Sequence, residues 1–303
     1  MPETRYAEAN GLSIAYETFG RPTDPPVLLV MGLGTQMIAW PDELCERIAD
    51  RGYFVVRFDN RDVGLSTHLS ELPAPALRDL ITNRRRPPYR IEDMAEDAVG
   101  LLDELGITDV HLVGASMGGF IAQVIAANHP SRIRSLTLVM TSTGSRRVGH
   151  PKPKLFLRLL RRRVVTDRLG SVEAAVETFR IIGSQGYAFD EEHLRDLAGR
   201  SWDRAYDPHG YLRQLAAVLG QRNRTRQLQR LRVPTTVLHG LADPLVNVSG
   251  GLALARAIPG AGFIGFAGMG HDLPRPLWPR FAEEICRTAE QADESPRSVR
   301  QPR

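Results

Sequence analysis

Short apolar runs without polar alternation recur along the chain and predict strands that are buried on both faces. These runs occupy residues 27–31, 54–58, 110–113, 136–140, 235–239 and 263–266. Nearer the start, residues 6–19 alternate apolar and polar side chains around Asn10-Gly11, a dipeptide that suits a two-residue hairpin turn. The pattern therefore predicts an edge hairpin followed by a series of interior strands.

Helical patterns separate the apolar runs. The clearest covers residues 91–105, where apolar side chains return at helical spacing and Gly106 provides a stop signal. Alternating strands and helices imply right-handed crossovers, which place helices on both faces of a mainly parallel sheet. The predicted class is α/β, and active sites of such sheets lie at the carboxyl ends of the strands.

The alternation stops between residues 144 and 231. Four helix-like stretches follow one another there, near residues 154–165, 172–182, 191–198 and 210–219, without a convincing strand. We interpret residues 144–231 as an inserted all-helical cap over the strand ends, and residues 1–143 with 232–291 as the α/β core. Residues 292–303 are mostly polar, charged or proline, and we expect them to form a disordered tail.

Composition narrows the class of protein. The 303 residues are 42% hydrophobic, which is enough for a large buried core. No apolar run approaches the roughly 18 to 20 residues of a membrane span, and Glu3, Arg5 and Glu8 stand where a signal peptide would be apolar. We therefore expect a soluble cytoplasmic protein. Its two cysteines, Cys45 and Cys286, are far apart and suggest neither a disulfide framework nor a zinc site.

Positive charge is concentrated in the middle of the chain. Residues 144–233 contain 19 Lys and Arg against 9 Asp and Glu, whereas the whole chain has a net charge of +4. The segment has no nucleic-acid module signature and no tight basic tract beyond residues 161–163. We interpret it as a solvated basic surface, with an anionic ligand as the alternative, and predict no nucleic-acid partner.

A nucleophile motif follows the third interior run. Gly114-Ala115-Ser116-Met117-Gly118-Gly119 joins this apolar run to the helical pattern of residues 120–127. A serine on such a strand-to-helix turn has a strained backbone that only small neighbours permit, and its hydroxyl projects above the sheet. Ser116 is therefore the predicted nucleophile, although a glycine-rich turn with an incidental serine would have the same sequence.

A serine hydroxyl needs a base, and histidine supplies one with a suitable pKa. Among eight histidines, His271 stands in a glycine-rich loop, residues 268–274, between the last apolar run and the last helical pattern. Asp243 follows the run at 235–239, whereas the preceding run ends in Met140-Thr141-Ser142-Thr143, without a carboxylate. The sequence thus predicts a triad in the order Ser116, Asp243, His271.

Two backbone N–H groups complete the predicted site. Met117 begins the helix after the nucleophile, and Leu33 lies in the loop after the first interior run, so we expect both N–H groups to form an oxyanion hole. Residues 57–66 are dense in charge, and we interpret them, Asp59 included, as a hydrogen-bonded structural loop. This chemistry requires no cofactor and no metal.

Together these residues resemble the α/β-hydrolases that are similar to aclacinomycin methylesterase, which remove a methyl ester from an anthracycline polyketide. The resemblance rests on Met31-Gly32 with Trp40, and on residues 57–66, 114–119, 207–217 and 268–274. It implies the α/β-hydrolase fold and a serine esterase. Met31 replaces a histidine that is common before the oxyanion glycine. Asp62-Val63 replaces a glycine that commonly follows the loop arginine, and we expect this change to be structurally local.

The predicted reaction is hydrolysis of a carboxylic ester of a small molecule through an acyl-enzyme. Dehalogenases and epoxide hydrolases of this fold need an aspartate in place of Ser116. A C–C bond hydrolase or an aminopeptidase with the same triad, and a non-catalytic ligand receptor, remain alternatives. The sequence identifies neither the natural ester nor the oligomeric state.

A final expectation concerns the size of the substrate. Four methionines and a tryptophan near the strand ends are candidates for lining a pocket suited to a bulky aromatic group: Met31, Met37, Trp40, Met140 and Met269. The alternative is that the methionines fill gaps in the core. Arg158 and Arg162 could in addition favour an acidic or phenolate substrate.

Overall fold

A computed structural model describes residues 2–76, 87–152, 155 and 165–294 of the chain. Its centre is an eight-stranded sheet in the order β1-β2-β4-β3-β5-β6-β7-β8. The strands are β1 Arg5–Ala9, β2 Leu12–Phe19, β3 Pro26–Val30, β4 Phe54–Phe58, β5 Val110–Ala115, β6 Ile133–Val139, β7 Thr235–Gly240 and β8 Gly262–Phe266. All pairs from β4 to β8 are parallel, so the predicted α/β class is confirmed.

The edge hairpin is also confirmed. β1 pairs antiparallel with β2, and the turn residues Asn10 and Gly11 both have positive φ, as a two-residue hairpin turn requires. β2 then pairs antiparallel with β4, which joins the hairpin to the parallel part of the sheet. In the strand order, three strands separate β1 from β5.

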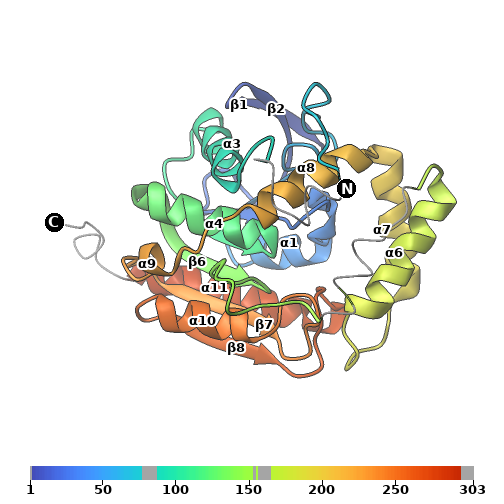
Figure 1. The fold of residues 1–303 in the computed structure, drawn as a ribbon. Coiled ribbons are helices and arrows are strands. Elements are labelled where there is room, and N and C mark those ends of the chain that lie inside the picture. The colour runs from blue at the N-terminus through green and yellow to red at the C-terminus, as the bar shows by residue number, and fades with distance from the viewer. Residues whose placement is uncertain (1, 77–86, 153–154, 156–164, 295–303) are drawn as a thin grey trace.

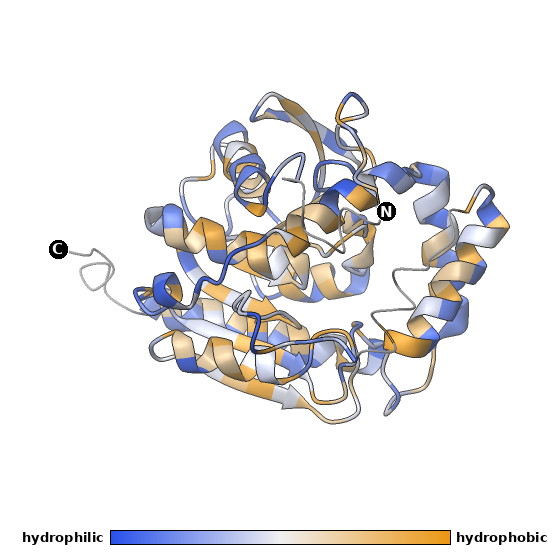
Figure 2. Cartoon of the chain, viewed as in Figure 1, coloured by the Kyte–Doolittle hydropathy of each residue, from blue (hydrophilic) through white to orange (hydrophobic). Residues whose placement is uncertain are grey.

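Helices cover both faces of the sheet (Figure 1). One core cluster contains buried residues of α3 (Ile91–Glu104), α4 (Met117–Asn128) and α10 (Ser249–Ala257). The other contains those of α1 (Asp42–Ala49) and α11 (Trp278–Glu294). Figure 2 shows the hydrophobic colours concentrated in the strands and the hydrophilic ones on outer helices and loops. Burial between helices and sheet therefore supplies the main driving force for this fold.

The middle of the chain is helical, as expected. It contains α6 (Arg168–Ile182), α7 (Glu191–Arg204), α8 (Pro208–Leu219) and the short α9 (Thr225–Leu228). Aspartates cap the first three helices: Asp167, Asp190 and Asp207 each accept a hydrogen bond from a backbone N–H of the first turn. Figure 1 shows α6 and α7 side by side at the right of the view, away from the sheet. The domain boundaries drawn from the sequence remain a prediction.

Several boundaries differ from those expected. β5 continues to Ala115 and β6 begins at Ile133, because both strands lie inside the sheet and stay paired over their whole length. α7 runs to Arg204, six residues past the predicted end. The helix expected at 154–165 falls almost wholly outside the described residues. The expectation of a disordered tail from residue 292 was wrong for its first three residues, because α11 continues to Glu294 and buries Ala292. Residues 295–303 lie outside the described residues. Among the helices described, none is long and apolar enough to cross a membrane.

Candidate active site

The nucleophile motif forms a sharp turn between β5 and α4. Ser116 has φ 53° and ψ −115°, a backbone conformation that costs a side-chain-bearing residue on the order of 1–3 kcal/mol. A methyl group on Gly118 would overlap the carbonyl oxygen of Val30, and one on Gly114 would overlap the carbonyl of Gly118. Glycine is therefore required on both sides of Ser116 by contacts with backbone, as the sequence predicted.

His271 lies in the loop between β8 and α11. Its Nε2 is 3.0 Å from the Ser116 Oγ, and its backbone N–H donates to the carbonyl of Ile182 at 2.7 Å. The imidazole is buried, whereas Ser116 keeps part of its surface exposed.

Asp243 lies in the loop after β7, and its Oδ2 is 2.8 Å from the His271 Nδ1. Its other oxygen, Oδ1, accepts the backbone N–H groups of Leu245 and Val246, each at 2.8 Å. Both carboxylate oxygens are thus engaged, and the side chain is held by its own turn. An ionised Asp243 favours the tautomer with the proton on the His271 Nδ1, which leaves Nε2 free to accept the serine proton.

The structure therefore brings the three predicted triad residues together from the ends of β5, β7 and β8. A second histidine, His239 of β7, lies close to Asp243 but does not contact Ser116 through any recorded bond. Its Nε2 donates to the carbonyl of Val246 at 2.8 Å, and burial lowers the pKa of this imidazole. The N–H of His239 is therefore occupied by a hydrogen bond to the backbone, which indicates a structural role. His271 remains the candidate base.

The loop that carries Leu33 lies directly beside the nucleophile. A Cβ on Gly32 would be 3.2 Å from the Ser116 Cβ. The next residue but one, Gly34, donates its N–H to the Gln214 Oε1 at 2.7 Å, and the Gln214 Nε2 donates to the carbonyl of Arg61 at 2.7 Å. Gln214 of α8 thus holds the predicted oxyanion loop, a role that sequence reasoning missed. Leu33 and Met117 as oxyanion donors remain a prediction.

The candidate pocket residues lie in the interior. Met37, Trp40 and Met269 have no exposed surface, and Trp40 and Met269 belong to the core cluster that packs against α1 and α11. The burial of these three residues favours the alternative that they fill the core, and it does not support a role in lining a pocket. Met31 and Met140 keep 5% and 6% exposure, so for these two the expected lining role remains a prediction. Arg158 and Arg162 lie outside the described residues.

The charged loop after β4 is structural, in agreement with the sequence interpretation. Asp59 Oδ1 accepts the backbone N–H of Met37 at 2.7 Å, and its Oδ2 accepts that of Leu65 at 2.9 Å. The same oxygen pairs with Arg204 of α7 at 2.6 Å. Asp59 is therefore fully used in holding loops and a helix in place.

Asp62 corrects one expectation. The sequence suggested that its departure from glycine was structurally local, yet Asp62 has a φ of 66° and binds the fully buried Arg213 of α8 in a bidentate ion pair, at 2.7 and 2.9 Å. Asp62 thus connects the loop after β4 to Arg213 of α8, which is 151 residues later in the chain. The expectation was wrong because the sequence indicates only that a residue other than glycine stands at this position. It does not show that the Asp62 carboxylate forms an ion pair with Arg213.

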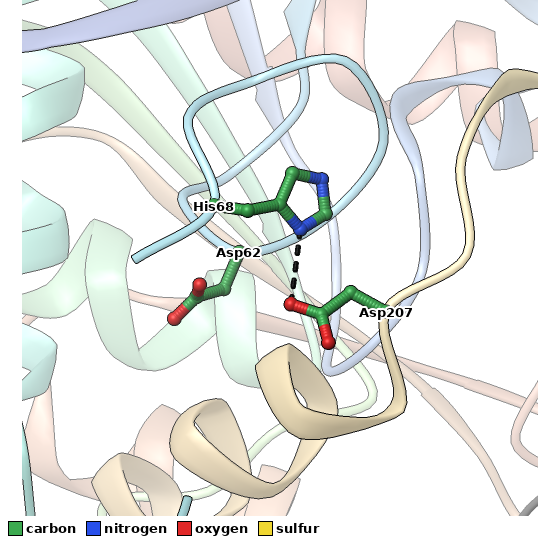
Figure 3. Close-up of side chains that lie close together, drawn as sticks. All are labelled: Asp62, His68 and Asp207. Carbon is green, nitrogen blue, oxygen red and sulfur yellow. Dashed lines mark hydrogen bonds and ion pairs between the residues drawn. The ribbon is translucent and has the colours of Figure 1, made fainter. Parts of the chain in front are cut away.

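Figure 3 shows Asp62, His68 and Asp207, whose ligand-type atoms lie within 4.8 Å of one another. Arg213 donates to both carboxylates, and His68 Nδ1 is 3.1 Å from Asp207 Oδ2. The guanidinium already supplies the positive charge that a metal ion would bring. We therefore interpret this group as an ion-paired anchor for α8.

Several arginines of the basic middle segment form ion pairs with acidic residues of the same segment. Arg168 pairs with Asp203, Arg180 with Glu191, and Arg195 with Glu173. These pairs connect α6 with α7, and exposed pairs of this kind contribute little to stability. They support the interpretation of a solvated surface.

Two further residues beside the base were not foreseen. Asp272 accepts hydrogen bonds from the side chain and backbone of Ser184, which follows α6. The available signal was the pair of glycine-rich segments, 183–186 and 268–270, because closely spaced glycines often mark a close approach of two backbones.

Comparisons with known proteins found relatives and solved structures that match almost the whole chain. The chain is 29% identical to rhodomycin D methylesterase DauP of Streptomyces sp. (strain C5) and 28% identical to DnrP of Streptomyces peucetius, each alignment covering 94% of this chain and 97% of the relative. Among solved structures, the enol-lactonase from Burkholderia xenovorans LB400 superposes with a TM-score of 0.73 at 22% identity, over 94% of this chain and 100% of that one. An esterase from Rhodococcus sp. ECU1013 has the same TM-score and identity, with 95% and 99% covered.

The family model for the alpha/beta hydrolase fold matches residues 25–274, a range that contains Ser116, Asp243 and His271. It follows that this chain belongs to the alpha/beta hydrolase fold family.

Proposed function

We propose that this protein is a serine hydrolase that cleaves a carboxylic ester through an acyl-enzyme. The observation that carries the proposal is the hydrogen-bonded chain from Asp243 through His271 to the Ser116 Oγ, with contacts of 2.8 and 3.0 Å. These distances lie within the range in which a base can take the proton of a nucleophile. The methylesterase relatives, similar over almost their full length, support the same class of reaction.

In the first half of the reaction, the Ser116 Oγ attacks the ester carbonyl carbon while His271 Nε2 takes the hydroxyl proton. The resulting imidazolium faces the Asp243 carboxylate, which holds the ring and stabilises its charge. The tetrahedral intermediate collapses as His271 returns the proton to the departing alkoxide oxygen. An alcohol leaves, and the acyl group stays bonded to Ser116.

In the second half, a water molecule gives its proton to His271 and attacks the acyl carbon. Collapse of this intermediate breaks the bond to Ser116, which regains its proton, and releases the carboxylic acid. In both halves the N–H groups of Leu33 and Met117 are the proposed oxyanion donors. The strain at Ser116 keeps the hydroxyl fixed at the N-terminal end of α4, whose dipole also favours negative charge. None of these steps calls for a cofactor.

For the substrate, we propose a methyl ester of a bulky aromatic acid of the polyketide type. The support is the activity of the two Streptomyces relatives, which are rhodomycin D methylesterases. The cytoplasmic location expected from the sequence belongs to the same proposal. C–C bond hydrolysis and aminopeptidase activity with this triad are the competing reactions.

The test is a panel assay with purified protein and its Ser116→Ala variant. The panel contains p-nitrophenyl butyrate, methyl esters from acetate to polycyclic aromatic carboxylates, a dienone with a cleavable carbon–carbon bond, and a proline p-nitroanilide. We expect ester cleavage that depends on Ser116, with the highest kcat/KM for a polycyclic methyl ester. Cleavage of the dienone or the anilide alone would contradict the esterase proposal. A preference for short aliphatic esters would contradict only the bulky substrate.

A further inference from the structure

The turn after α6 and the loop that carries His271 are joined by five hydrogen bonds. The backbone of the turn contributes two of them, since Gly186 N–H donates to Gly268 O at 2.9 Å and Ile182 O accepts the N–H of His271 at 2.7 Å. The other three centre on Ser184, which is 86 to 88 residues away in sequence from its partners. This contact is therefore a tertiary one between the predicted cap and the histidine loop.

Ser184 is the central member of this contact. Its Oγ donates to Asp272 Oδ1 at 2.5 Å and accepts the N–H of Gly270 at 3.0 Å, while its backbone N–H donates to Asp272 Oδ2 at 3.1 Å. Gly270 and Asp272 are the two neighbours of His271 in the chain. One serine thus fixes the backbone on both sides of the candidate base.

The two segments approach each other more closely than side chains would allow. A Cβ on Gly270 would overlap the carbonyl group of Gly183, and one on Gly186 would lie 2.6 Å from the Gly268 Cα. Only glycine permits this contact on either side. The approach is therefore built into both segments and does not result from a single side chain.

The position of Asp272 also has an electrostatic consequence. Three titratable groups interact with the His271 ring: Asp243, Asp272 and His239, whose pKa is lowered by burial. Burial raises the pKa of Asp272, whereas the Ser184 hydrogen bonds and the charge of His271 oppose that rise. Asp272 directly follows His271 in the chain, and its carboxylate, held by Ser184, interacts electrostatically with the His271 ring.

We propose that Ser184 and Asp272 are positioning residues for His271: Ser184 fixes the backbone of the histidine loop, and the Asp272 carboxylate favours the protonated imidazole. This inference rests on the proposed function, because His271 must act as the base. Asp243 holds the ring itself through Nδ1, whereas Ser184 and Asp272 act on the loop and on the charge.

Two variants separate the two roles. Ser184→Ala removes both Oγ hydrogen bonds and keeps the Asp272 charge. Asp272→Asn removes the charge, yet its amide can still donate to the Ser184 Oγ and accept the Ser184 N–H. Thr178→Val serves as the matched control, since Thr178 lies in α6, the helix that precedes Ser184, and its Oγ1 donates to the carbonyl of Ala174 within that helix.

For Ser184→Ala we expect kcat for p-nitrophenyl butyrate to fall about tenfold, with KM changed less than about twofold, because a misplaced base impairs chemistry more than binding. For Asp272→Asn we expect the acidic limb of the kcat/KM profile to move to lower pH by about half a unit, because a nearby negative charge favours the protonated ring. Thr178→Val should change neither quantity. An unchanged kcat in the first variant or an unmoved limb in the second would overturn the proposal, and so would a loss of thermal stability as the only effect.

A second readout keeps this inference separate from the question of substrate. A fluorophosphonate probe reacts with an activated serine whether or not the natural ester is known. We expect wild-type protein to be labelled at Ser116 and Ser184→Ala to be labelled about tenfold more slowly. Normal labelling without cleavage of any ester in the panel would refute the proposed esterase function and leave the positioning role standing. Equal labelling rates for wild type and variant would refute the positioning role.

Discussion

The nucleophile and the base of this protein are held in different ways. Ser116 is fixed by its immediate neighbours in sequence, since Gly114 and Gly118 allow the turn and β5 and α4 flank it directly. His271 lies in the loop between β8 and α11, and five hydrogen bonds join this loop to the end of α6 and the turn that follows it. The first arrangement is local and the second depends on a segment more than 80 residues away.

This difference predicts which property, stability or catalysis, a substitution in each region should change. A side chain at Gly114 or Gly118 would overlap the backbone around β3 and α4, which belong to the core of the fold. A side chain at Gly186 or Gly270 would overlap the backbone of the opposing segment beside His271. We therefore expect substitution of the elbow glycines to affect mainly stability, and substitution of the glycines beside His271 to affect mainly catalysis.

The largest effect is expected for Ser116→Ala. The change removes one partly exposed oxygen, so the fold should persist while esterase kcat falls by about 10⁴ to 10⁶. Turnover of p-nitrophenyl butyrate and the thermal unfolding midpoint provide the two measurements. Near-normal turnover by a variant free of contaminating esterase would show that Ser116 is not the nucleophile.

Asp243→Asn should lower kcat by about 10⁴, because the amide no longer favours the tautomer with a proton on His271 Nδ1. The same assay measures this loss, and Asp59→Asn provides a comparison at another buried carboxylate near the strand ends that the mechanism does not use. If Asp243→Asn kept most of the activity and the comparison variant lost it, the acid would be misassigned.

A pair of glycine substitutions sharpens the comparison between the two regions. Gly270→Ala should separate the histidine loop from Gly183, and we expect kcat to fall about 100-fold in a folded protein. Gly118→Ala places a methyl group against the backbone of β3 and should lower the free energy of unfolding by about 1–3 kcal/mol or more. Urea denaturation and steady-state kinetics of both variants test this. The reverse pattern would refute the division into a stability region and a catalytic region.

The smallest effect concerns His239. Burial lowers the pKa of this imidazole in the folded state, so the unfolded chain binds the proton more readily. Stability from this group is thus present above the ordinary pKa of histidine and is lost as the pH falls through the lowered one. We expect the unfolding free energy to decrease on acidification from about pH 7 to pH 5, and to decrease less in His239→Gln. Equal pH dependence in both proteins would contradict this.

Much of the fold followed from local patterns. Buried strands of Val, Leu and Ile, a helix stop at Gly106 and the Asn10-Gly11 turn depend on neighbouring residues, so a sequence shows them directly. The proximity of the triad could also be predicted, because parallel strands bring their carboxyl ends to one edge. Boundaries inside the sheet were less exact, since pairing with neighbouring strands extends them.

Contacts between distant segments could not be predicted in the same way. Ser184 and Gln214 lie in helical or loop sequence with no periodic signal for their partners, Asp272 and Gly34. The buried Met37 and Met269 show a related limit, because apolar residues near strand ends suit a pocket and a core equally well. In such cases the sequence shows which residues are available, and only the packing shows what they touch.

The order of the triad along the chain has a consequence for biosynthesis. Ser116 precedes His271 by 155 residues, and β7 and β8, which carry Asp243 and His271 to the site, are the last two strands. A nascent chain that has completed β5 and α4 therefore displays the strained serine without its base. Such a chain lacks the general base for ester cleavage until the ribosome has made residues up to His271, so the order of synthesis delays hydrolysis until β7 and β8 have joined the sheet.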